Sequence, residues 1–132
     1  MKTEFKMSFS DYLETEVLEF AFTTSGGTRP TAWYLALFTA APSDSGGGTE
    51  VSGGAYARQS VTFTVSGDTA SNSAAIEFPT ATANYGTVTH VGVFDASSSG
   101  NLLAWAALTS SKTIETGDVF RVPSGDLDIT LN

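Results

Sequence analysis

The chain has 132 residues, enough for one domain with a hydrophobic core of its own. It contains no cysteine, which excludes disulfides, zinc–thiolate centres and thiol nucleophiles. Its 14 Asp and Glu outnumber 6 Lys and Arg, and the net charge of −8 disfavours contact with the phosphate backbone of nucleic acids. Only 15% of the residues are charged, compared with about 25% in typical soluble domains, which suits a protein covered by neighbours.

The beginning of the chain shows no export signal, because Glu14, Glu16 and Glu19 interrupt the apolar core that a signal peptide needs. No stretch approaches the ~18 apolar residues of a membrane span. We therefore expect a soluble protein without membrane partners. Residues 1–7 are predicted to form an N-terminal arm, and residues 8–132 are predicted to form a single domain.

Residues 8–22 are predicted to form a helix. Apolar side chains recur there at the spacing of one helix face, at Phe9, Leu13, Val17, Phe20 and Ala21. Ser8 or Ser10 is expected to cap its N-terminus, and Gly26–Gly27 followed by Pro30 ends it. The apolar face is wider than a lone body needs, so we expect the helix to pack on the domain or on a neighbouring subunit.

The remainder of the chain is predicted to form short strands separated by glycine-rich turns. The predicted strands are residues 33–39, 56–65, 74–78, 88–94, 102–108, 119–122 and 127–131. Their regular spacing predicts a mainly β fold, an antiparallel β-sandwich or jelly-roll-like barrel with one N-terminal α-helix. The side chains expected in its core are Trp33, Leu35, Leu37, Val91, Val93, Leu103, Trp105, Leu127 and Ile129.

Few residues offer chemistry. His90 is the only histidine and lies in an apolar strand, where we favour a packed or interface histidine over a general base. Asp126 and Asp128 leave one face of a strand and could bind calcium with Asp95 or Asp118, but a solvated strand face is favoured. We therefore predict no enzyme, no catalytic or metal-binding residues and no cofactor.

The aromatic side chains could build a sugar-binding platform. Trp33 and Trp105 lie in apolar strands and are predicted to be core residues. Tyr56 and Tyr85 lie in glycine-rich surroundings and are the better candidates for exposed contacts.

Several segments in fixed order carry a resemblance to a known family. These are residues 33–42, 46–59, 86–95, 100–108, 117–118 and 123–127. Together they resemble a family of small tailed-bacteriophage structural proteins, often labelled tail fibre protein. The resemblance covers nearly the whole chain after the first helix. It implies a virion protein without enzymatic activity and transfers no catalytic residue to this chain.

The loop of residues 43–57 and its neighbours supply the candidate partner contacts: Glu50, Tyr56, Arg58 and Tyr85. Arg58 is expected either to pair with Glu50 or to face a partner subunit. We expect a capsid cement or decoration subunit; the alternatives are a small tail or fibre-base subunit, or a receptor- or glycan-binding module. The expected partners are the major capsid protein or tail proteins and further copies of the chain, for example in a trimer, within a virion assembled in the host cytoplasm.

Overall fold

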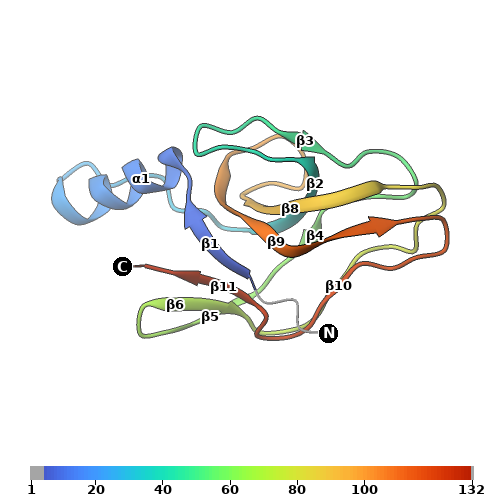
Figure 1. Ribbon diagram of the computed structural model, residues 1–132. Coiled ribbons are helices and arrows are strands. Elements are labelled where there is room, and N and C mark those ends of the chain that lie inside the picture. Colours follow the sequence, from blue (N-terminus) through green and yellow to red (C-terminus); the bar gives the residue numbers. More distant parts are fainter. Residues whose placement is uncertain (1–4, 132) are drawn as a thin grey trace.

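The computed structural model describes residues 5–131 and is mainly β, with one helix near the N-terminus (Figure 1). The helix is α1 (Asp11–Phe22). The strands are β1 (Phe5–Phe9), β2 (Tyr34–Ala40), β3 (Thr49–Glu50), β4 (Gln59–Ser60), β5 (Phe63–Ser66), β6 (Thr69–Asn72), β7 (Ile76–Glu77), β8 (Gly86–Phe94), β9 (Leu102–Ile114), β10 (Arg121–Val122) and β11 (Leu127–Thr130).

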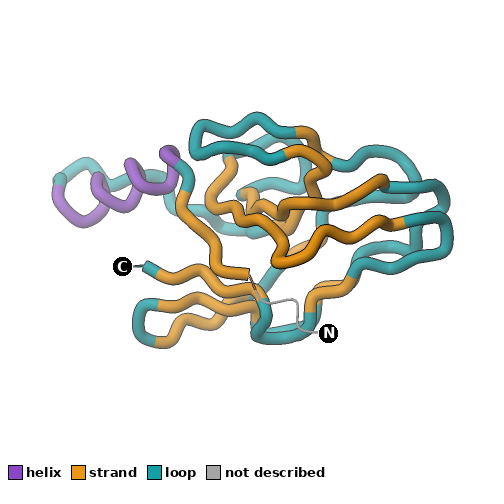
Figure 2. The backbone as a smooth tube through the Cα atoms, viewed as in Figure 1, coloured by secondary structure: helices purple, strands orange, loops and turns teal. Residues whose placement is uncertain are grey.

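The strands form a sandwich whose two layers share β1. Strands β3, β2, β8 and β9 follow one another in the first layer, and β11, β6 and β5 form the second (Figure 2). Strand β1 pairs antiparallel with β9 through Ser8 and Phe9, and parallel with β11 through residues 5–7. The order of the nine-stranded sheet, β3-β2-β8-β9-β1-β11-β6-β5 with β4 beside β2, is open and not closed into a barrel. The predicted sandwich with one N-terminal helix is confirmed.

Three details of the prediction are corrected. The β1–β11 pair is parallel, so the sandwich is not wholly antiparallel. Residues 5–7 of the predicted arm belong to strand β1, while residues 1–4 lie outside the described part of the chain. The helix begins at Asp11 and not at residue 8, because β1 continues to Phe9. The strand was detectable: apolar residues alternate with polar ones along Phe5–Phe9.

The core lies between the layers and contains most of the predicted side chains. Fully or almost fully buried are Leu35, Leu37, Val91, Val93, Leu103 and Leu127. Trp33 and Ile129 are half-buried and pack against them. The core also contains buried residues that sequence reasoning did not place there, namely Phe78, Tyr85, Ile114, Phe120 and Val122.

The prediction that Trp105 is a core residue is wrong. The register between β8 and β9 shifts at one point: Val93 pairs with Ala104, but the next residue, Phe94, pairs with Leu102. Leu103 therefore has no partner residue on β8 and forms a β-bulge in β9. Leu103 and Ala104 both lie in the core cluster. This bulge reverses the alternation of side chains beyond it, and Trp105 is half-buried on the outer face. Its indole Nε1–H donates to Asp44 Oδ1 at 2.8 Å.

A smaller apolar cluster covers the outer face of the first layer. Phe38 and Phe94 stack there with ring centroids 6.1 Å apart, beside Leu102. Gly92 lies beneath them. A Cβ at Gly92 would come within 2.9 Å of Leu102 Cδ1 and 3.0 Å of Phe38 Cε1, so the rings approach the backbone closely because no side chain intervenes.

Helix α1 stands out from one end of the sandwich (Figure 1). Ser10, and not Ser8, is its N-cap: the Ser10 Oγ accepts from Leu13 N at 3.2 Å and donates to Leu102 O at 2.5 Å. Tyr12 and Leu13 in the first turn pack against the core, but no residue of the helix is buried. Within residues 5–131 no helix has the length and apolarity needed to cross a membrane.

Candidate functional site

Glu50, Tyr56 and Arg58 form one hydrogen-bonded cluster, which we call the Arg58 clamp. The Arg58 guanidinium donates from Nε to Glu50 Oε2 at 2.9 Å and from Nη2 to Glu50 Oε1 at 2.8 Å. Its Nη1 donates to the carbonyl oxygens of Ala96 and Ser99 at 3.0 and 2.8 Å. The clamp therefore ties strand β3 to the turn between β8 and β9.

The tyrosine of the clamp joins it to the core. The Tyr56 hydroxyl donates to Glu50 Oε2 at 2.6 Å and accepts from the backbone N–H of Leu37 at 3.1 Å. Its ring stacks on Phe78 with centroids 6.0 Å apart and meets Tyr85 edge to face at 5.8 Å. Tyr56 is consequently a link between loop and core, and not an exposed aromatic platform.

The electrostatics of the clamp hold Glu50 ionised. Burial alone would raise the pKa of Glu50, but hydrogen bonds from Arg58 and Tyr56 outweigh it and lower the pKa below its usual range. Burial and the bond to Glu50 raise the pKa of Tyr56. The side chains of Arg58 and Glu50 are 7% and 26% exposed. Of the two arrangements expected for Arg58, the structure shows the pair with Glu50.

The expectation that Tyr85 is exposed is wrong. Only 5% of Tyr85 is accessible, and its hydroxyl donates to the carbonyl of Pro79 at 3.0 Å. The segment from Phe78 to Tyr85 turns inward and closes one end of the core, with Ala81 buried between them. Tyr85 therefore lies buried directly before strand β8, which begins at Gly86, and not at the tip of a loop.

The loop of residues 43–57 lies along the sheet and is attached to it. Ser43 and Gly46 bond to each other's backbone at 2.9 Å in both directions. The backbone N–H of Asp11 donates to Asp44 O at 2.9 Å, which joins the loop to the start of α1. Val51 N donates to Leu37 O at 2.9 Å. A Cβ at Gly46 would meet no atom within 4 Å, so the outer backbone of this turn is open to a neighbour.

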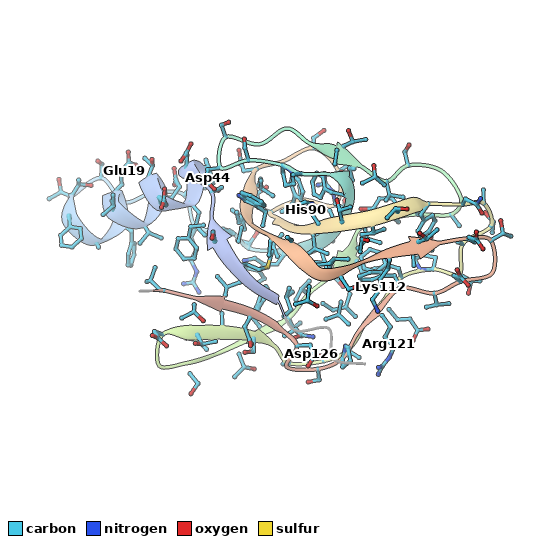
Figure 3. All side chains as sticks on the ribbon, viewed as in Figure 1. Glu19, Asp44, His90, Lys112, Arg121 and Asp126 are labelled. Atoms are coloured by element: carbon cyan, nitrogen blue, oxygen red, sulfur yellow. The ribbon has the colours of Figure 1, made fainter. Side chains whose placement is uncertain are left out.

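The residues considered for catalysis are used structurally. His90 is half-buried; its Nδ1 lies 2.8 Å from Thr89 Oγ1, and its ring centroid lies 6.0 Å from that of Trp105. Figure 3 shows His90 on the first layer, far from Asp126. Nowhere in residues 5–131 do three His, Asp or Glu side chains gather as metal ligands would.

The carboxylates considered for calcium bind within their own turns or strands. Asp95 Oδ1 accepts from Asn101 N at 2.7 Å, and Asp118 Oδ2 accepts from Glu115 N at 2.9 Å. Asp128 accepts a hydrogen bond from Ser71 on the neighbouring strand. These groups stabilise turns and strand pairs.

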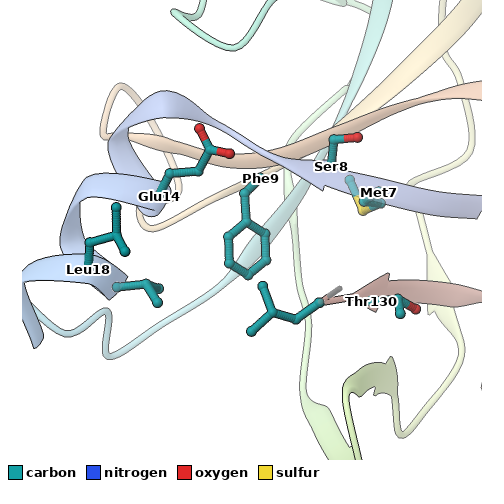
Figure 4. Close-up of a pocket in the computed structure, with 8 residues that line it drawn as sticks. Met7, Ser8, Phe9, Glu14, Leu18 and Thr130 are labelled. Atoms are coloured by element: carbon teal, nitrogen blue, oxygen red, sulfur yellow. The ribbon is translucent and has the colours of Figure 1, made fainter. Parts of the chain in front are cut away.

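The second notable surface is apolar and surrounds α1; we call it the apolar end. Six large apolar side chains are exposed among the described residues, and five belong to this end: Leu18, Phe20, Phe22, Val65 and Leu131. A groove of about 720 Å³ runs between α1 and the end of β11 (Figure 4). A second groove of about 420 Å³ is lined by Leu13, Trp33, Phe63, Val65 and Ile129. Of the exposed apolar residues of α1, the sequence analysis named only Phe20; it named neither Leu18 nor Phe22, and it did not predict that they join the tips of β5 and β11.

A β-sandwich with turn-bound carboxylates, an internal arginine clamp and an uncovered apolar end has the features of a structural subunit. Residues 8–130 match the family described as Podophage GP4 fiber I protein gp80, and the chain belongs to this family. No curated protein matches the chain. The resemblance to tailed-phage structural proteins is thereby confirmed, and the chain is a phage virion structural protein.

Proposed function

We propose that the protein is a non-enzymatic subunit of the phage tail, located at the base or a junction of a fibre. The observation that carries this proposal is the apolar end, where Phe20 and Phe22 are 77% and 81% exposed. Apolar surface of this kind marks a contact with another protein. The family's description as a fibre protein favours the fibre over the capsid. It therefore favours the small tail or fibre-base subunit over the capsid cement or decoration subunit.

A base or junction fits better than a shaft. Fibre shafts are built from sequence repeats or coiled coils, which extend them along one axis. The described chain is instead a single sandwich with one 12-residue helix. The same lack of a repeat suits a capsid decoration subunit, which is the second candidate.

The loop of residues 43–57 is the proposed contact with further copies of the chain. Further copies of the chain would contact the open backbone at Gly46 and Gly47, where a Cβ would meet nothing within 4 Å. Glycine lets another chain approach closely, and repeated weak contacts add up in an assembly. A glycan-binding role has less support, because Tyr56 and Tyr85 face inward. We also propose that the virion containing this subunit is assembled in the host cytoplasm.

The location is tested by comparing maps of complete particles with maps of particles lacking this gene product. We expect the missing density at the tail, where fibres attach. Missing density spread over the head lattice would favour the capsid decoration subunit. Particles that never contain the chain would overturn the structural role itself.

A further inference from the structure

We propose that helix α1 is a docking helix that inserts into an apolar groove, rimmed by lysine or arginine, on a different virion protein. The inference rests on the proposed structural role and names the chemistry of one partner. Three features of the described chain carry it: exposed apolar side chains on both sides of the helix, an excess of carboxylates on the helix, and few cations among the described side chains.

The projecting half of α1 is apolar on opposite sides. Leu18 and Phe22 are four residues apart and share one face, whereas Phe20 is rotated by about 200° from Leu18. Leu18 lines the groove beside β11, and Phe20 lines a separate hollow with Leu13 and Pro30. A flat surface could cover only one of these faces. A partner that covers both must enclose the helix, which is the helix-in-groove mode of recognition.

The helix is also weakly supported within its own chain. Its first turn is fixed by the Ser10 cap and by Leu13, but none of its 12 residues is buried. Isolated helices of this length are marginal in water, and most helix stability in proteins comes from packing of an apolar face. Burial by a partner would supply that packing.

The charge of α1 defines the rim of the partner groove. Four acidic side chains, Asp11, Glu14, Glu16 and Glu19, stand on the helix, and no basic residue lies in its last turn. The negative end of the helix dipole is therefore uncompensated. Lysine or arginine around the partner groove would neutralise both the carboxylates and the exposed carbonyl end.

Among the side chains that the structure describes, a second copy of the chain offers few cations for the rim of such a groove. The cations with described side chains are Arg29, Arg58, Lys112 and Arg121. Arg58 is enclosed in the clamp, Arg29 lines the hollow beside Glu16 and Phe20 of its own helix, and Arg121 forms an exposed pair with Glu77 at 3.8 Å. Figure 3 shows Lys112 and Arg121 on the side of the molecule opposite Glu19 of α1. Two α1 helices packed together would instead bring two sets of four carboxylates into contact.

The test uses the full chain in complemented particles. A phage lacking the gene is grown with plasmid-supplied wild type, F20S/F22S, E14K/E19K or V119S, and copies per particle are measured against the major capsid protein by mass spectrometry. Val119 is the matched control, because it is the sixth exposed apolar side chain and lies outside the apolar end. Thermal unfolding of each purified variant verifies that it is folded.

We expect wild type and V119S to be incorporated equally, and F20S/F22S and E14K/E19K to fall by at least about tenfold while remaining folded. Carbodiimide, which joins carboxylates to lysine amines, is expected to link residues 11–22 to a different virion protein. Equal incorporation of all four chains would overturn the docking helix but leave the structural role standing. Absence of wild type from particles would overturn the structural role. Cross-links only to Lys2, Lys6 or Lys112 of a second copy would show self-association and overturn the partner assignment.

Discussion

Arg58 holds both carboxylate oxygens of Glu50, from Nε to Oε2 at 2.9 Å and from Nη2 to Oε1 at 2.8 Å. The carbon at the centre of the same guanidinium lies 3.7 Å from the ring centroid of Phe94. One side chain thus combines a two-pronged ion pair with a cation–π contact, and only arginine has the planar fork that permits both. This relationship fixes strand β3 and the β8–β9 turn over the outer apolar cluster.

Replacement of Arg58 by lysine is expected to lower the free energy of unfolding by about 2–3 kcal/mol. A lysine ammonium cannot reproduce the two-pronged bond to Glu50 and at the same time keep the bonds to Ala96 and Ser99, so part of this largely shielded hydrogen-bond network is lost. Urea unfolding measures the loss. Arg121→Lys is the control: this pair is exposed and 3.8 Å long, so its change should stay below about 0.5 kcal/mol. Equal losses for Arg58→Lys and Arg121→Lys would show that the clamp stabilises the fold no more than an exposed ion pair does.

Acid is expected to weaken the clamp. Burial raises the pKa of Glu50, but the hydrogen bonds from Arg58 and Tyr56 lower it to a net value below that of the unfolded chain. A group with a lowered folded pKa contributes stability above its unfolded pKa, about 4.3, and this contribution is lost as the pH falls through the folded pKa. The free energy of unfolding of wild type, measured from pH 7 down to pH 3, should therefore decrease more steeply than that of Glu50→Gln. Glu77→Gln, at an exposed carboxylate, should follow wild type.

Addition of one methyl group at Gly92 is expected to disturb the outer cluster. The Cβ of Gly92→Ala would approach Leu102 Cδ1 to 2.9 Å and Phe38 Cε1 to 3.0 Å, so these side chains must shift. Overpacking of this kind costs about 1–3 kcal/mol. Thermal unfolding should show the loss, and Gly26→Ala, where a Cβ meets nothing within 4 Å, should be nearly neutral. A G92A protein as stable as wild type would mean that the cluster is loosely packed.

The sequence predicted those strands in which branched aliphatic residues recur at every second position. Leu35 and Leu37, and Val91 and Val93, alternate in their strands and are buried as expected. Strand β1 also alternates, but it directly precedes the helix and resembles an extension of it. Its position between β9 and β11 depends on residues more than 90 positions away, which local periodicity does not contain.

The clamp and the apolar end were predictable only in part. Glu50 and Arg58 are close in sequence and of opposite charge, so their pairing could be anticipated. Their connection to Ala96 and Ser99 requires the β2–β8 pairing and could not. Phe20 belonged to the predicted helix face, whereas Leu18 and Phe22 fell outside it, and Val65 and Leu131 join them only through the fold. Tyr85 was misplaced because a glycine-rich neighbourhood suggests a loop, although the backbone of this residue pairs with Ile114.

The bulge at Leu103 gives the last prediction. Because Trp105 is half-buried on the outer face, Trp105→Ala is expected to cost about 1–2 kcal/mol, less than the 3–5 kcal/mol typical of a core tryptophan. Leu37→Ala, at a fully buried position, should cost more, about 2–5 kcal/mol. Trp105→Phe retains an aromatic ring but removes the bond to Asp44 Oδ1, and should cost about 1 kcal/mol. Urea unfolding of the three variants gives the order, and W105A as destabilised as L37A would place the indole in the core and contradict the reversal of side chains by the bulge.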